Sequence, residues 1–110
     1  MSSHPVKGKT IHFVFRDGHM AGKTVAHSFH QDGSLDFDML DESGASSGKK
    51  VHVDKYEVAK VRDEVYAVAY LGGSGYTLTT VVDFEAKTLV AFSSNEKELG
   101  LQHGKIELPG

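Results

Sequence analysis

Apolar and polar residues alternate with a period of two along most of this chain. The alternation is visible in residues 10–15 (TIHFVF) and 24–29 (TVAHSF), and it is cleanest in residues 34–40 (SLDFDML). Such a pattern predicts half-buried β-strands. Asp-Gly pairs at residues 17–18 and 32–33 separate the three segments. They predict hairpin turns, because glycine tolerates a positive φ.

The second half of the chain continues the pattern. Residues 41–50 (DESGASSGKK) are polar and rich in glycine and serine, which predicts a long loop. Residues 94–100 fit a single helical turn, and no ten-residue window has the pattern of an amphipathic helix. Further strands are predicted at one or two places in residues 51–61, at 65–71, 76–84 and 88–94, and briefly at 105–108.

About seven to nine short antiparallel strands predict an all-β fold, either a sandwich or an up-and-down β-barrel. Hairpins between nearest neighbours favour the barrel. A chain of 110 residues supports one domain with one core. We expect this domain at residues 10–108 and a flexible tail at residues 1–9. A barrel of about eight strands encloses either its own side chains or one small ligand.

The hairpin at residues 65–84 has two largely apolar faces. A turn centred on Gly73–Ser74 would pair Tyr70 with Thr77, Val68 with Thr79 and Tyr66 with Val81. We expect this tyrosine and threonine face to line the interior, since polar groups in a pocket orient a ligand. The opposite alanine, leucine and valine face would then be covered by another subunit or a terminal segment. The reverse assignment of the two faces stays open.

The composition of the chain limits which partners and which cellular compartment we expect. The net charge is −3 and the sequence has no clustered basic patch, which argues against binding to nucleic acid. The chain has no cysteine, no apolar run of membrane-spanning length and no hydrophobic signal core. We therefore expect a cytoplasmic protein with no membrane contact and no disulfide.

Candidate catalytic and metal sites are weak. The seven histidines show no metal-ligand spacing, and His27 and His30 should point to opposite faces of a strand. We expect neither a metal nor a cofactor. Ser46 sits in a G-x-S-x-G pattern that lacks the following helix, so a loop explains it better. Asp83 could act as a base near a barrel mouth, although an Asx turn is the simpler explanation.

Residues 56–96 contain most of the segments that resemble a known protein family. The segments YEV, VYAVAY, TLTTVVDF and FSSNE, with FVFRDG near the start, resemble the MoaF-like family over most of residues 10–108. The resemblance implies a calycin or lipocalin-like barrel, and small-molecule binding is the usual supposition for that family.

The pattern also resembles the phenolic acid decarboxylases. Those enzymes have two tyrosines where this chain has Phe13 and Phe15, and a glutamate where it has Gly72; only Lys49 or Lys50 loosely matches their substrate-binding arginine. Phenylalanine cannot donate a hydrogen bond and glycine cannot transfer a proton, which argues against decarboxylation.

The leading hypothesis is a homodimeric barrel that binds a small apolar or aromatic molecule. An enzyme with acid–base chemistry in the cavity, and a dimerisation module with a filled core, are the alternatives. The expected ligand-binding residues are Phe13, Phe15, Phe29, Phe37, Met39, Tyr56, Tyr66, Tyr70, Thr77, Thr79 and Asp83.

Overall fold

The computed structural model describes residues 4–72 and 75–109. Within that range it is all-β, as the alternation predicts, with one short 3-10 helix. The elements are β1 (Lys9–Phe15), η1 (Gly18–Met20), β2 (Thr24–Phe29), β3 (Leu35–Leu40), β4 (Ser46–Val53), β5 (Tyr56–Arg62), β6 (Val65–Leu71), β7 (Thr77–Asp83), β8 (Thr88–Ser94) and β9 (Leu99–Glu107).

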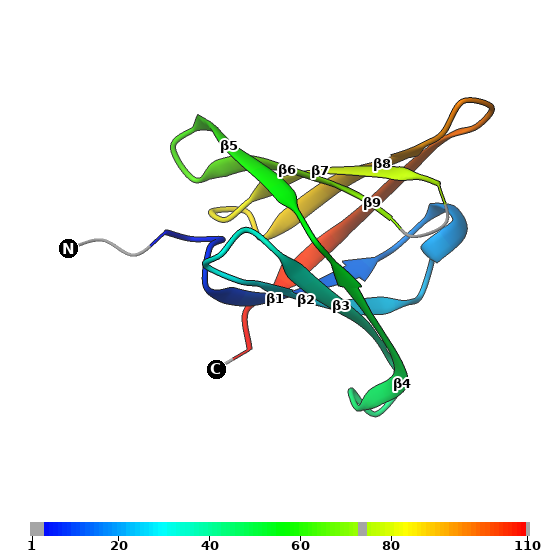
Figure 1. Ribbon diagram of the computed structural model, residues 1–110. Helices are drawn as coiled ribbons and strands as arrows, with labels where there is room; N and C mark the ends of the chain where they lie inside the picture. The colour runs from blue at the N-terminus through cyan, green and yellow to red at the C-terminus, as the bar shows by residue number, and fades with distance from the viewer. Residues whose placement is uncertain (1–3, 73–74, 110) are drawn as a thin grey trace.

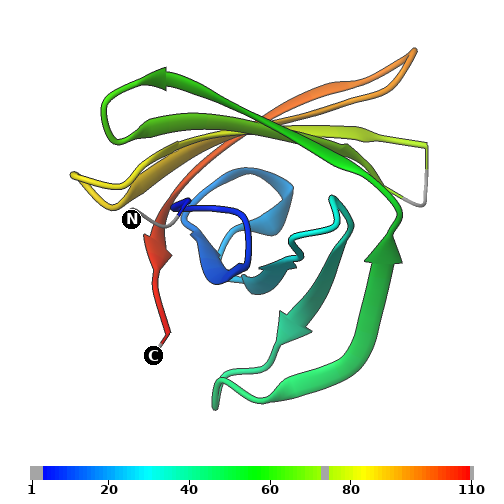
Figure 2. The same ribbon diagram turned by 60° about the vertical axis from the view of Figure 1, so that its left-hand side comes forward.

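All nine strands belong to one antiparallel sheet with the order β4-β3-β2-β1-β9-β8-β7-β6-β5. Consecutive strands pair with each other within β1–β4 and within β5–β9, and β1 also pairs with β9. The sheet curls so that β1, β2 and β3 face β6, β7 and β8 across the core (Figures 1 and 2). Among the described residues, no pairing joins β4 to β5. We call the gap between these two edge strands the seam.

Two predicted segments differ from the structure. The loop expected at residues 41–50 is confined to residues 41–45, where the Asp41 carboxylate accepts hydrogen bonds from the Ser43 and Ala45 amides. Polar residues 46–50 then pair with β3 as an edge strand, which needs no apolar face. The helical turn expected at residues 94–100 is instead a tight turn capped by Asn95, and β9 already begins at Leu99.

The predicted register of the β6–β7 hairpin was wrong by one residue. Tyr70 pairs with Leu78, Val68 with Thr80 and Tyr66 with Val82. A shift of one residue moves every side chain of a strand to the other face. Thr77, Thr79 and Asp83 therefore lie on the outer face, opposite to the tyrosines. The expected turn centre, residues 73–74, lies outside the described residues.

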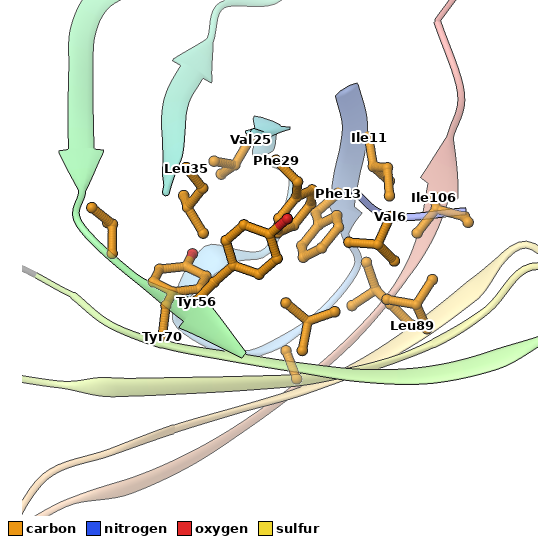
Figure 3. Close-up of a cluster of buried hydrophobic side chains, with 14 of the residues drawn as sticks. Val6, Ile11, Phe13, Val25, Phe29, Leu35, Tyr56, Tyr70, Leu89 and Ile106 are labelled. Carbon is orange, nitrogen blue, oxygen red and sulfur yellow. The ribbon is translucent and has the colours of Figure 1, made fainter. Parts of the chain in front are cut away.

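The core fills the interior of the curled sheet. Phe13, Phe29 and Tyr56 meet near its centre, and aliphatic residues from the facing strands surround them (Figure 3). Val6 is also buried, against the end of the core formed by Ile11, Leu89 and Ile106 (Figure 3). Val6, which lies in the segment expected to be a tail, thus contributes to the core.

Gly104 allows β9 to pass close to β1. It pairs with Phe15 on β1 and Leu89 on β8, and a Cβ atom there would clash with the backbone carbonyl oxygen of Val14. Because backbone atoms cannot rotate away as a side chain does, no residue with a side chain fits this crossing without moving a strand.

We expect Gly104→Ala to lower the free energy of unfolding by at least about 2 kcal/mol, measured by urea denaturation. Gly100→Ala on the same strand is the control, because its Cβ would meet the rotatable Ser93 hydroxyl at 2.8 Å. Equal stability of the two variants would show that the β1–β9 crossing is not tight.

Candidate functional site

A buried histidine lies on the inner face of β2. Period-two alternation places His27 between the inward residues Val25 and Phe29, and only 2% of His27 is exposed. Its ring lies against Phe13, with the ring centroids 4.0 Å apart, and Phe37 and Tyr70 approach from other sides. His27 is thus enclosed in an aromatic cage.

Hydrogen bonds fix the tautomer of His27. The Nδ1 atom lies 3.3 Å from the carbonyl oxygen of Val25, and the Nε2 atom lies 2.8 Å from the hydroxyl of Tyr70. A carbonyl oxygen can only accept a hydrogen bond, so Nδ1 carries the ring proton and donates the hydrogen bond to Val25. Nε2 therefore accepts a hydrogen bond from the Tyr70 hydroxyl.

Burial makes this pair neutral. Desolvation is the largest influence on His27 and lowers its pKa to about 3; the Val25 hydrogen bond opposes the shift and His12 adds to it. Desolvation also raises the pKa of Tyr70 well above its ordinary range. Near neutral pH neither group changes charge, so the pair acts as a fixed polar bridge between β2 and β6 rather than as a ready acid and base.

A cavity of about 340 Å³ opens at the end of the curled sheet where η1 lies. We call it the η1 cavity. Its apolar walls include Met20, Phe37 and Leu78, and Ser93 and Gln102 supply polar groups. The other described lining residues are His19, Gly72, Tyr76, Glu98, Leu99 and Gly100.

The cavity exists because β9 presents small residues inward. Gly100, Gln102 and Gly104 alternate on its inner face, beside Ser93 on β8. Gly100 has no side chain and Ser93 has a small one, so this end of the interior is less filled than the other end, where the sheet carries large side chains. The ring of Phe37, whose centroid is 6.0 Å from that of His27, separates the cavity from the His27–Tyr70 pair.

Most of the expected ligand-binding residues lie in or against the core, away from the η1 cavity. Of the eleven, Phe37 alone is among the described residues that line the η1 cavity. Inside the sheet, Phe13, Phe15, Phe29, Tyr56 and Tyr70 are buried in the core, and Phe37, Met39 and Tyr66 pack against it. The Tyr56 hydroxyl donates to the carbonyl oxygen of His30.

Asp83 lies far from this cavity. It ends β7 at the opposite end of the β6–β7 hairpin, paired with Val65. Its carboxylate accepts hydrogen bonds from the amides of Glu85 and Ala86, at 3.0 Å each. An Asx turn therefore accounts for the position of the Asp83 carboxylate.

Sequence reasoning missed His27, Ser93, Gly100 and Gln102. The signal for His27 was present, because Val25 and Phe29 place it on the apolar face. The inward alternation of Gly100, Gln102 and Gly104 was also readable, but the last strand was predicted at residues 105–108 and included none of the three.

Other histidines gather on the outer surface. Asp36 accepts hydrogen bonds from His30 at 3.0 Å and His52 at 2.7 Å, and Lys50 lies 3.9 Å away. These contacts lower the pKa of Asp36 and raise that of His52. Across residues 4–72 and 75–109, no group of three or more histidine or acidic side chains could hold a metal ion. No helix in the same ranges is long and apolar enough to cross a membrane.

His27 should make the protein less stable in mild acid. The unfolded chain takes up a proton near pH 6.5, whereas folded His27 resists it down to about pH 3. Stability is thus lost as the pH falls through this window, by about 2 kcal/mol between pH 7 and pH 5. His27→Gln, which keeps an acceptor for Tyr70, should flatten this dependence in urea denaturation. His52→Gln, at an exposed histidine whose pKa is raised by its hydrogen bond to Asp36, should not flatten it. An unchanged slope in His27→Gln would contradict a buried neutral histidine.

Comparisons with known proteins agree with this architecture. A crystal structure named "putative beta-lactamase from Burkholderia vietnamiensis" superposes with a TM-score of 0.77 at 20% identity, covering 99% of this chain and 100% of that one. At this identity the likeness shows the fold alone. No curated protein matched the sequence. The sequence pattern of the MoaF-like family matches residues 7–107, which is nearly the whole chain. This chain therefore belongs to the MoaF-like family.

Proposed function

We propose that this protein binds a small, apolar or aromatic molecule in the η1 cavity. The observation that carries the proposal is an apolar-walled space of about 340 Å³ that is also lined by the buried polar side chain of Gln102. Small-molecule sites have this composition, with mostly apolar walls and a few polar groups that set orientation.

A larger hollow of about 550 Å³ follows the seam, but its lining suits such a ligand less well. It includes the exposed charged residues Asp54, Lys55 and Glu57. Charged groups at an open surface keep their water and offer little apolar contact. The η1 cavity is therefore the better candidate despite its smaller volume.

Catalysis is the weaker alternative. The His27–Tyr70 pair is neutral and lies behind Phe37, and Asp83 is engaged in a turn. The name of the Burkholderia structure suggests β-lactam hydrolysis as a possible reaction. Ser46 and Lys49 have the S-x-x-K spacing that occurs in class A β-lactamases. Both are exposed on edge strand β4 and neither lines the η1 cavity, so an acyl intermediate on Ser46 would lie outside that cavity.

Filling the cavity should abolish binding. We expect Ser93→Leu to weaken naphthalene binding at least about tenfold, since the added side chain occupies the ligand's space. Ser94→Leu makes the same change at the next position, which points outward, and should bind like the wild type. Fluorescence titration measures both, and native mass spectrometry of freshly purified protein would reveal a molecule retained from the cell. No binding by the wild type, or equal binding by Ser93→Leu, would refute the proposal.

A second copy of the chain is the proposed cover for the outer face of β6–β9. The outward residues Ala69, Thr79, Phe92 and Leu101 lie in register across these four strands. Phe92, Leu101 and neighbouring Leu71 are exposed. This row carries no charge, so a self-complementary contact would bury no unpaired ion.

We expect the wild type to sediment as a dimer at micromolar concentration and Leu101→Glu as a monomer, because the introduced carboxylate would be desolvated at the interface. Leu108→Glu, at an exposed leucine beyond β9, should remain dimeric. A monomeric wild type in analytical ultracentrifugation would contradict the dimer.

A further inference from the structure

The side chain of Gln102 is buried at the η1 cavity with an unused hydrogen-bond acceptor. Gln102 is 4% exposed and lines the cavity. Its Oε1 atom is buried without a hydrogen-bond partner in the structure. An unpartnered buried polar atom destabilises the folded protein, so it calls for an explanation.

The position of Gln102 is fixed by η1. Gly18, with a φ of 75°, begins η1, and a Cβ atom there would lie 2.5 Å from Cγ of Gln102. The carboxylate of Asp17, the preceding residue, makes two hydrogen bonds with His103. One comes from the backbone amide of His103 at 2.6 Å, and the other joins it to the Nδ1 atom of His103 at 2.9 Å. These contacts hold η1 over Gln102 and shield it from water.

The unpartnered oxygen lies close to Gly100 and Ser93, two residues that line the η1 cavity with Gln102. A Cβ atom built on Gly100 would sit 3.6 Å from Oε1 of Gln102 and 2.8 Å from Oγ of Ser93. A ligand group at this wall of the cavity would therefore lie near both polar side chains. The Ser93 hydroxyl can donate or accept, whereas Oε1 can only accept.

The charge at the cavity disfavours anions. Glu98 lines it, and no lysine or arginine is among the described lining residues. The pKa of Tyr76 is raised, first by desolvation and then by the negative charge of Glu98. An incoming carboxylate would meet repulsion from Glu98 and find no cation to pair with.

We propose that the ligand is an uncharged aromatic molecule whose buried end carries an O–H or N–H group that donates a hydrogen bond to Oε1 of Gln102. Its ring would lie among Met20, Phe37 and Leu78, and Glu98 would exclude its carboxylate analogues. This inference rests on the proposed function and adds the chemical class of the ligand to it.

Four naphthalene probes test the ligand class in fluorescence titrations, which are readable because the chain has no tryptophan. They are naphthalene, 2-naphthol, 2-methoxynaphthalene and 2-naphthoate. We expect 2-naphthol to bind about tenfold tighter than 2-methoxynaphthalene, which lacks the donor, and 2-naphthoate to bind weakest. Gln102→Leu should remove the preference for 2-naphthol, and Thr80→Val, a buried isosteric change on β7, should keep it.

The outcomes separate this inference from the proposed function. Equal binding of 2-naphthol and 2-methoxynaphthalene by the wild type would overturn the donor assignment while the binding function stands. Tightest binding of 2-naphthoate would also overturn it, and no binding of any probe would refute both. Gln102→Leu offers a readout without ligand, because removing an unpartnered polar group should raise the urea midpoint; a lowered midpoint would show that Gln102 is already satisfied.

Discussion

The pairing of β1 with β9 is the constraint on which the rest of the structure depends. It joins the meander of β1–β4 to that of β5–β9, and so curls nine strands into one sheet around a single core. The pairing is possible because Gly104 lets β9 pass the β1 backbone. The same strand then carries Gly100 and Gln102 inward to the wall of the η1 cavity. The curling of the sheet and the composition of the cavity therefore depend on one segment.

The interior has two different ends. At one end Val6, Leu89 and Ile106 fill the space between the walls (Figure 3). At the other end glycine, serine and glutamine replace large apolar residues, and the η1 cavity remains. The His27–Tyr70 hydrogen bond lies between them and links β2 to β6 without introducing a charge. A protein selected only for stability would fill such a space, whereas binding sites retain unfilled space and unpartnered polar groups at a cost in stability.

Local alternation predicted the strands well, because most are apolar on one face only. It failed where that rule does not hold: β4 is a polar edge strand, and the first half of β9 alternates glycine and glutamine with leucine. The register of the β6–β7 hairpin depends on the residue count of a glycine-rich turn, and an error of one residue transferred Thr77 and Thr79 to the wrong face. The aromatic residues that sequence reasoning assigned to a ligand mostly fill the core, because periodicity shows which face is apolar but not whether that face encloses empty space.

The central claim is that a small aromatic molecule enters the sheet at η1. Met20 belongs to η1 and lines the cavity, and the chain has three methionines, so methyl-labelled methionine gives a simple NMR spectrum. Titration with 2-naphthol should shift the Met20 methyl resonance strongly, by the ring current of the bound aromatic. Binding that leaves the Met20 resonance unmoved would place the ligand elsewhere and contradict the account.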